Sequence, residues 1–275
     1  MRWPWSSKED HGESIRVPGI STSAHSNDRN EWRGAYTEPR TLIPAVGFTL
    51  STLVAVRLYK SYLRRIPTVN HIKPSYFRRR SLFGRVTSVG DADNFRLYHT
   101  PGGRLAGWEW LPWKRIPTKR EGVMKQTLHI RIAGVDAPEL AHWGREAQPF
   151  SKEAFDYLTN LILNQRVRVH LYRRDQYDRI VARVYVRKWL RRKDVGLEML
   201  KLGLATVYEA RTGAEFGDAE AQYRAAEEAA KEGKIGMWAQ PSLLQKLSGS
   251  SVTPLESPRE YKSRHAMADK QKKVG

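Results

Sequence analysis

The chain contains no cysteine, and this absence removes several classes of protein. Without thiols it cannot form disulfides, use a cysteine nucleophile or bind a metal through thiolates. The eight histidines are scattered and show no His-Glu-x-x-His or comparable spacing, which disfavours a zinc hydrolase site. Neither a Walker motif nor the glycine pattern of dinucleotide-binding folds is present.

Acidic residues are scarce relative to basic ones. The 29 Asp and Glu are outnumbered by 48 Lys and Arg, and the formal net charge is +19. A chain this basic favours an anionic partner, either nucleic acid or an acidic membrane surface, and charge alone does not choose between them. Nothing in the sequence indicates a protein partner. The length of 275 residues predicts one domain of about 150 residues with appendages.

Long uncharged runs are also rare, and the clearest one lies near the N-terminus. Residues 1–40 carry six basic and six acidic residues and predict a disordered polar arm. Residues 41–56 then follow without a charge, and snorkelling of Arg57 would extend the apolar span to residue 59. We therefore expect a transmembrane anchor over residues 41–59. A buried helix and a cleavable signal peptide are the alternatives.

Basic residues flank this apolar segment on its C-terminal side. The stretch from Arg57 to Arg80 holds eight Lys and Arg and no acid. Positive charge beside a span tends to stay on the cytoplasmic or matrix-like side, and the following domain would stay there too. The same stretch could bind anionic lipid headgroups or nucleic-acid phosphates. We expect a basic linker over 60–80, a globular domain over 81–240 and a disordered basic tail over 241–275.

Periodicity within residues 81–240 predicts five strands and three helices. The strands are expected over 83–89, 95–98, 127–133, 167–171 and 180–186. The helices are expected over 149–164, with Pro149 in the first turn, over 194–202, capped by Asp194, and over 215–232. This element list predicts a mostly β domain with helices, of the α+β class.

An irregular insertion separates the second and third expected strands, over residues 101–126. It contains Trp108, Trp110 and Trp113 within six residues. Three uses of these rings are open: stacking on bases, lying in a membrane interface, or closing over the barrel. We favour packing over the barrel.

Residues suited to phosphodiester chemistry gather at the end of the third expected strand, in Ile130-Arg-Ile-Ala-Gly-Val-Asp-Ala-Pro-Glu139. Arg131 lies on the face opposite the aliphatic residues and offers a fork for phosphate oxygens. Asp136 offers a hard oxygen ligand for a divalent cation, and Glu139 could take a proton from water. An ordinary pattern of surface ion pairs is the alternative for this block taken alone.

Further motifs, in a fixed order, give the chain a resemblance to a known family. Besides Arg131 to Glu139 they are Asp91-Ala-Asp-Asn94, Gly144-Arg-Glu-Ala147, Asp175-Gln-Tyr-Asp-Arg179, Gly203-Leu-Ala205 and Gly236-Met-Trp238. In this order they resemble the staphylococcal-nuclease (thermonuclease-like) family, over about residues 83 to 238. The resemblance implies a five-stranded OB-fold barrel and calcium-dependent cleavage of DNA and RNA that leaves 3′-phosphates.

The same resemblance implies roles for individual residues. The carboxylates of Asp93 and Asp136 would bind Ca²⁺, with the Ala137 carbonyl beside them and Asp91 in support. Glu139 would act as the general base that activates water. Arg131 and Arg179 would clamp the phosphate and stabilise the transition state. Tyr177 would stack on a base or hydrogen-bond a phosphate, with packing on the barrel rim as the alternative.

Several positions depart from the family pattern. Ala92 and Asn94 stand where Gly and Thr are common, and Ala92 would be strained if its φ were positive. Ala137 replaces a frequent Thr. Asp178 replaces a glycine and adds a charge that could pair with Arg179 or weaken its hold on phosphate.

The N-terminal anchor makes the chain resemble the fungal branch of this family, whose members are probable endonucleases of a mitochondrial membrane. Residues 1–40 form no Arg-rich, acid-poor presequence, so another internal membrane stays open. Two further functions are alternatives to a membrane-anchored endonuclease. One is a non-catalytic OB-fold module that binds nucleic acid, and the other is a membrane-surface scaffold.

Overall fold

The computed structural model describes residues 39–117, 122–123, 125–141, 146–209, 215–239, 258, 260–261 and 263–264. The chain divides into two compact units, Met1–Arg57 and Leu58–Gly275. Most of the arm and of the tail expected over residues 1–40 and 241–275 lies outside the described residues.

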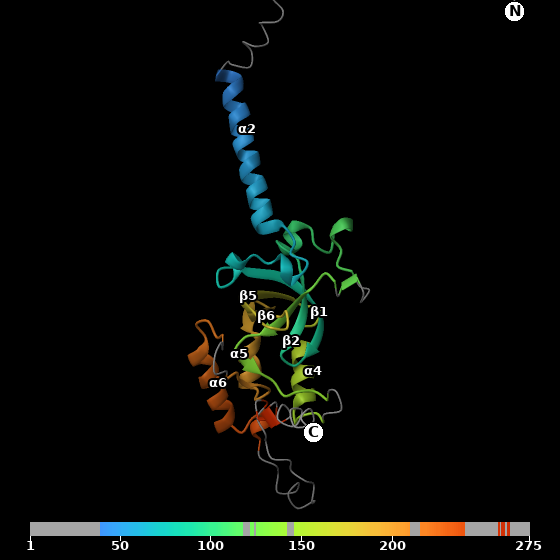
Figure 1. Ribbon diagram of the computed structural model, residues 1–275, viewed down its shortest axis with the longest axis vertical. Coiled ribbons are helices and arrows are strands. Elements are labelled where there is room, and N and C mark those ends of the chain that lie inside the picture. The colour runs from blue at the N-terminus through green and yellow to red at the C-terminus, as the bar shows by residue number, and fades with distance from the viewer. Residues whose placement is uncertain are drawn as a thin grey trace, which may run out of the picture. The chain divides into compact units, whose positions relative to one another are not determined.

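The N-terminal unit is described through one helix, α2 (Pro39–Leu58), drawn in blue in Figure 1. Every residue of α2 is exposed. Together with Tyr59–Leu63 it gives 25 residues, and among the described helices it is the one long and apolar enough to cross a membrane. Twenty residues of α-helix span about 30 Å, which is the thickness of a bilayer hydrocarbon core.

The C-terminal unit is built on a closed barrel of five strands. These are β1 (Ser81–Asp91), β2 (Asn94–His99), β3 (Leu128–Ile132), β5 (Arg166–Arg174) and β6 (Ile180–Lys188). They lie in the order β3-β2-β1-β5-β6, and a parallel pairing between β3 and β6 closes the ring (Figure 1). The predicted α+β fold with a five-stranded OB-fold barrel is confirmed.

Two features extend the barrel beyond the five predicted strands. Strand β7 (Arg191–Asp194) forms a hairpin with β6. A separate two-stranded sheet pairs β4 (Val135–Asp136) with β8 (Thr206–Val207). Because β4 follows β3 after a two-residue turn, this small sheet fixes the segment that carries Asp136.

The three predicted helices accompany the barrel in the part of the chain that the structure describes: α4 (Ser151–Ile162), α5 (Val195–Lys201) and α6 (Glu220–Glu232). The placement of Pro149 in the first turn of α4 was wrong, because Phe150 has φ 64°, in the left-handed region, and the helix begins after it. Helix α6 begins at Glu220 rather than 215. Asp194 caps α5 as predicted, since its side chain accepts a hydrogen bond from the Leu197 N–H.

Short helical turns connect these elements. They are η1 (Tyr59–Leu63), a π-helical turn, and the 3₁₀ turns η2 (Val69–His71), η3 (Pro74–Tyr76), η4 (Gly103–Ala106), η5 (Pro112–Lys114) and η6 (Gly236–Trp238).

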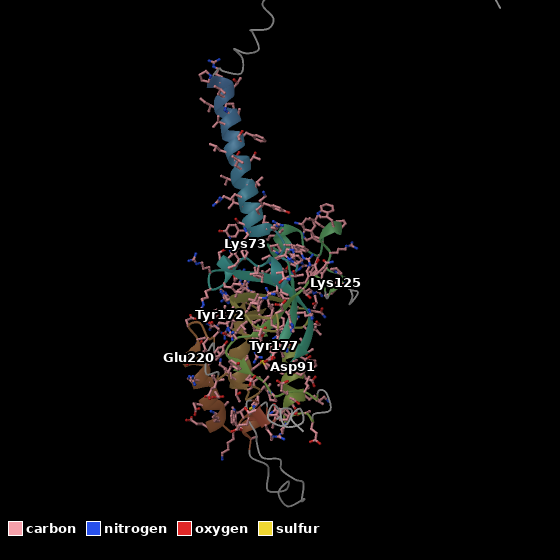
Figure 2. All side chains as sticks on the ribbon, in the orientation of Figure 1. Lys73, Asp91, Lys125, Tyr172, Tyr177 and Glu220 are labelled. Atoms are coloured by element: carbon pink, nitrogen blue, oxygen red, sulfur yellow. The ribbon has the colours of Figure 1, made fainter. Side chains whose placement is uncertain are left out.

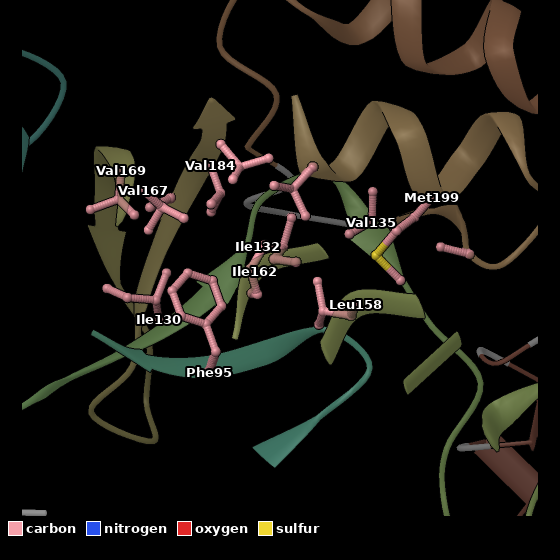
Figure 3. Packing of buried hydrophobic residues seen from close by; sticks show 14 of the residues in the cluster. Phe95, Ile130, Ile132, Val135, Leu158, Ile162, Val167, Val169, Val184 and Met199 are labelled. Atoms are coloured by element: carbon pink, nitrogen blue, oxygen red, sulfur yellow. The ribbon is translucent and has the colours of Figure 1, made fainter. Parts of the chain in front are cut away.

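The core fills the space between the barrel and helices α4 and α5. Figure 3 shows Phe95, Ile130, Ile132 and Leu158 among the residues packed there. The predicted alternation of β3 is confirmed, because Leu128, Ile130 and Ile132 are fully buried while His129 and Arg131, on the opposite face, keep part of their surface exposed. The aliphatic residues of β3 thus anchor the strand and direct Arg131 away from the core.

The tryptophans of the insertion divide into two groups. Trp108 is buried, stands edge-on to Tyr98 with ring centroids 6.0 Å apart, and donates its indole N–H to the Pro101 carbonyl. Packing, the favoured alternative, is therefore correct for Trp108. Trp110 and Trp113 are 62% and 76% exposed.

Candidate active site

Strand pairing brings the Asp91–Asn94 turn beside Arg131. In the β2–β3 pairing Asn94 lies opposite Arg131, and the Ile132 N–H donates to the Asp93 carbonyl at 2.9 Å. The Arg131 Nη2 then lies 3.0 Å from Asp93 Oδ2 and 3.1 Å from Asp136 Oδ1. All three side chains are largely buried. The predicted metal carboxylates therefore converge on one guanidinium group.

A tight turn brings Asp136 back to this point. Gly134 has φ 74°, and a Cβ there would lie 2.6 Å from Phe216 Cδ1, so the turn between β3 and β4 requires glycine. Strand β4 then pairs with β8, and the Thr206 hydroxyl donates to the Asp136 carbonyl at 3.2 Å. The backbone on both sides of the carboxylate is thereby fixed.

The charge of Arg131 is strongly favoured in this setting. Burial opposes the charged form, but the adjacent carboxylates of Asp93 and Asp136 outweigh it, and the pKa of Arg131 lies above its ordinary value. Its guanidinium also lies 5.1 Å from the ring centroid of Tyr208. Arg131 therefore remains a cation that bridges two carboxylates.

A second acidic pair, Asp91 and Glu139, lies next to the first. Burial, and then the charges of Asp93 and Glu139, raise the pKa of Asp91 to about 7. Asp91 and Glu139 line one cavity of about 490 Å³, together with Asn94 and His129. Negative charge at this end of the barrel thus exceeds what the local environment stabilises.

Gln148 holds the backbone of Glu139 from both sides. The Glu139 N–H donates to Gln148 Oε1 at 2.8 Å, and the Gln148 N–H donates to the Glu139 carbonyl at 3.0 Å. Gln148 is itself buried. Sequence reasoning missed this residue, and its position directly after the Gly144–Ala147 motif was the one signal available.

Arg179 reaches the site from the turn before β6. In the parallel β3–β6 pairing Ile130 lies opposite Ile180, so Arg179 comes beside β3. Asp175 accepts from the backbone N–H groups of Tyr177 and Arg179 and, at 2.7 Å, from Arg179 Nε. Although burial raises the pKa of Asp175, these hydrogen bonds and the charge of Arg179 lower it below its usual value. Asp175 therefore holds both the turn and the guanidinium.

The two predicted phosphate clamps share a cavity. Arg131 and Arg179 both line a space of about 400 Å³, with Tyr177 and Tyr208 among its other residues. Tyr177 is 67% exposed and its ring centroid lies 5.1 Å from the Arg179 guanidinium. Figure 2 labels Asp91 and Tyr177, which belong to the two turns that border the site. Sequence reasoning missed Tyr208.

The departures from the family pattern are accommodated without strain at Ala92. That residue is buried and does not have a positive φ. Asn94 donates to Asp93 Oδ1 at 3.2 Å and contacts His129 Nε2 at 3.1 Å. Asp178 has φ 61° and forms its ion pair with Arg174. Its ion pair is therefore with Arg174 and not with Arg179, the pairing that was one of the two alternatives.

The donor set is that of a hard cation, although no tight ligand cluster is formed. Among the residues that the structure describes, no three His, Asp or Glu side chains stand together closely enough to hold a metal ion. Asp93 and Asp136 nevertheless present buried carboxylates at one point, and burial followed by the charges of Asp93 and Glu139 raises the pKa of Asp91 nearby. Oxygen-only donors of this kind suit Ca²⁺ or Mg²⁺ rather than a soft metal.

Similarity to known proteins shows the family of the chain. Residues 129–240 match the family described as staphylococcal nuclease homologue (SNase). "Probable endonuclease lcl3" of Pyrenophora tritici-repentis (strain Pt-1C-BFP) is 70% identical over 275 residues, which cover all of both chains. The chain belongs to the SNase family.

Other SNase relatives are similar over the same extent. "Probable endonuclease LCL3" of Leptosphaeria maculans (strain JN3) is 64% identical over 299 residues, covering 100% of this chain and 99% of the relative. The protein of the same name from Pyricularia oryzae (strain 70-15) is 54% identical, with 99% of each chain covered. The predicted resemblance to this family and to its fungal members is confirmed. The likeness spans the segment of α2 as well as the SNase domain.

Proposed function

We propose that this SNase-family protein is a membrane-anchored, calcium-dependent endonuclease that hydrolyses phosphodiester bonds of DNA or RNA. The observation that carries the proposal is the meeting of Arg131 with Asp93 and Asp136 beside a cavity that Arg179 also lines. The names of the fungal relatives as probable endonucleases support it.

Hydrolysis of a phosphodiester is slow because water approaches an anion while charge accumulates on the phosphoryl and leaving oxygens. Asp93 and Asp136 would hold the cation, with the Ala137 carbonyl and Asp91 in support. A bound Ca²⁺ would supply Lewis-acid polarisation of a phosphoryl oxygen. Calcium dependence is general in this family.

Glu139 would take the proton from the attacking water. Its backbone is held at the N–H and the carbonyl by Gln148, and its carboxylate interacts with that of Asp91. The carboxylate borders the same cavity as Asp91. A base fixed in this way loses little orientational freedom when substrate binds.

Arg131 and Arg179 would clamp the phosphate from two strands. The Arg131 Nη2 contacts two carboxylates. A cation that neutralised those carboxylates would release the guanidinium for the phosphate. Arg179 keeps Nε on Asp175 and lines the shared cavity. Tyr177, exposed beside it, would stack on a base or hydrogen-bond a phosphate. Contacts to phosphate rather than base edges imply broad substrate use.

Helix α2 supports the membrane anchor proposed over residues 41–59. The hydroxyls of Thr49, Ser51 and Thr52 each donate to the carbonyl four residues earlier, at 2.8 Å. Their polar groups are thus satisfied inside the helix, as a hydrocarbon environment requires. The nuclease domain is assigned to residues 81–240, after the linker 60–80. A mitochondrial membrane is the location proposed, from the resemblance to the fungal branch.

The alternative is a membrane-tethered OB-fold module that binds nucleic acid without cleaving it. The arginine-bridged carboxylates favour it, because Arg131 engages both of them directly. End-labelled single-stranded DNA and RNA, incubated with the full chain and Ca²⁺, separate the two functions. The endonuclease yields internal cuts with 3′-phosphate ends. Retarded but intact strands on a native gel would establish the binding module instead.

A further inference from the structure

A third cavity lies at the beginning of the SNase unit, away from the residues of the active site. It has a volume of about 470 Å³ and is lined by Arg64, Arg79, Arg80 and Arg168, with Ser61 and Ser81 between them. None of its lining residues borders either active-site cavity. The site is therefore built separately from the catalytic machinery.

The cavity carries positive charge that no acid balances. No aspartate or glutamate is among the described residues that line it. Four guanidinium groups around so small a space repel one another, and an anion bound among them would relieve that repulsion. This charge pattern differs from the active site, where Arg131 and Arg179 each have a carboxylate partner.

Two of the four arginines are fixed by neighbouring side chains. Arg80 lies 4.7 Å from the ring centroid of Tyr62 and 4.4 Å from that of Tyr76, and it also donates to the Ser61 carbonyl. Arg168 Nη1 donates to the Ser81 hydroxyl at 3.0 Å. These two guanidinium groups form a preorganised wall of the cavity.

The other two arginines keep their donors available. Arg64 and Arg79 are exposed, and their guanidinium groups make no hydrogen bond or ion pair with any residue that the structure describes. An arginine fork of this kind matches the oxygens of a phosphate group, and the hydroxyls of Ser61 and Ser81 add further polar atoms. The ligand chemistry that fits is a phosphate monoester or diester.

Covalent connection places this cavity close to the end of α2. Ser61 follows Leu58 by three residues, and three residues reach at most about 11 Å even when extended. If α2 spans a bilayer, Ser61 is therefore tethered within about 11 Å of the end of that span.

Exposed apolar residues also follow along the chain from two residues that line this cavity. Pro101 and Gly102 line it, and the chain continues into η4 and η5, in the green segment of Figure 1. Along this segment Leu105, Trp110 and Trp113 are 100%, 62% and 76% exposed. Tryptophan beside arginine is typical of membrane interfaces, where the indole lies at headgroup level.

We propose that this cavity binds the phosphate of an anionic phospholipid headgroup and docks the SNase domain on the membrane that α2 crosses. The inference rests on the proposed membrane anchor and is independent of the nuclease chemistry. A lipid is favoured over nucleic acid because of the nearby end of α2 and the exposed tryptophans.

The test uses the full chain in neutral detergent micelles, with lipid binding measured by native mass spectrometry. The ligands are short-chain phosphatidate and short-chain phosphatidylcholine. The variant Arg64→Gln/Arg79→Gln removes the two available forks. Arg187→Gln/Arg191→Gln is the matched control, because it removes two exposed arginines from the β6–β7 hairpin.

We expect phosphatidate to bind the wild-type chain and the hairpin variant equally, and the cavity variant about tenfold more weakly. Phosphatidylcholine should bind more weakly to all three. An equal loss of phosphatidate affinity in both variants would show that net charge alone determines binding, and it would overturn the proposal. Inorganic phosphate that displaces phosphatidate at equal concentration, or an oligonucleotide whose binding falls in the cavity variant alone, would also overturn it.

Two separate readouts keep this outcome distinct from that of the proposed function. Cleavage of a soluble oligonucleotide by the cavity variant should equal that of wild type, because neither arginine lies in the active site. Absence of cleavage by all chains would contradict the nuclease proposal and leave the lipid result standing. Failure of the full chain to resist carbonate extraction would contradict the anchor.

Discussion

Arg131 has two competing sets of partners at the centre of the site. Its Nη2 lies within 3.1 Å of both Asp93 and Asp136, the carboxylates that a cation would use. In the proposed mechanism a cation on the carboxylates would free the guanidinium for the phosphate, so the two ligands would bind together. Such an exchange would let a site with an arginine-bridged resting arrangement bind a charged substrate.

Asp91 gives a pH dependence that belongs to one residue. Its pKa is about 7 in the folded protein, whereas the pKa of an unfolded aspartate is about 3.9. Between these values the folded state binds more protons, so the Asp91 contribution to the free energy of unfolding falls as pH rises from about 4 to about 7. In chelator, Asp91→Asn should gain stability over wild type across this range.

The quantity to measure is the difference in the free energy of unfolding between wild type and Asp91→Asn, by denaturant unfolding with EGTA at several pH values. His99 and His129, whose pKa values fall to about 4 mainly through burial, act in the opposite sense and cancel in the difference. A difference that does not change with pH would show that Asp91 ionises normally.

Gln148 is predicted to act through Glu139 rather than on substrate. Gln148→Met removes the acceptor for the Glu139 N–H while keeping the length of the side chain. We expect kcat to fall about tenfold with little change in KM, because the base is displaced and phosphate binding is not. Gln148→Glu, which keeps the acceptor, should recover most of the loss. Equal losses in kcat and in thermal stability for both variants would indicate a purely structural role.

At the scale of elements, Asp194 joins a strand and two helices. It caps α5, accepts from Tyr223 of α6 at 2.8 Å and from Arg183 Nε of β6 at 2.6 Å. The pair of Arg183 and Asp194 is largely buried, with side chains 12% and 6% exposed. Loss of the carboxylate would leave a buried guanidinium without its main partner.

We therefore expect Asp194→Ala to lower the free energy of unfolding by about 3 kcal/mol. Tyr223→Phe, which removes one hydrogen bond to the same carboxylate, should cost about 1 kcal/mol. Both are measured by chemical denaturation. Equal effects of the two substitutions would mean that the ion pair with Arg183 adds nothing.

The sequence pattern predicted an element correctly where the local pattern of residues matches how the element packs in the fold. The alternation in β3 and the cap at Asp194 depend on neighbouring residues, and both were correct. Phe150 was placed inside a helix because its spacing fits one, but its backbone adopts φ 64° and the helix starts at Ser151. The hairpin strand β7 was missed because Arg191, Arg192 and Lys193 give it no apolar alternation.

The site was predictable as a set of residues and not as a set of contacts. The motifs identified Arg131, Asp93 and Asp136, and strand register then brings them together. The bridge from Arg131 to both carboxylates and the hold of Gln148 on Glu139 depend on side-chain positions across turns. Asp178 shows the same limit, because its partner proved to be Arg174 rather than Arg179.

At the scale of the whole molecule, the net charge of +19 is proposed to serve two anionic partners. The candidate active site would bind nucleic acid, and the arginine-lined cavity after α2 would bind lipid. Helix α2 should resist carbonate extraction when the full chain is expressed in fungal cells. Leu50→Lys/Val54→Lys places two charges in the span, at about 3 kcal/mol each, and should release the chain to the soluble fraction. A chain equally extractable before and after this change would not be anchored through α2.

The most direct test of the proposed nuclease activity is the calcium dependence of cleavage by the full chain. Single-stranded DNA is incubated with wild type, Glu139→Gln and Glu153→Gln, in Ca²⁺ or in EGTA. Glu153 is an exposed acid on α4 and serves as the matched control. We expect cleavage by wild type and Glu153→Gln in Ca²⁺ alone, and a loss of at least about 100-fold in Glu139→Gln. Cleavage that persists in EGTA, or that Glu139→Gln leaves unchanged, would contradict the proposed mechanism.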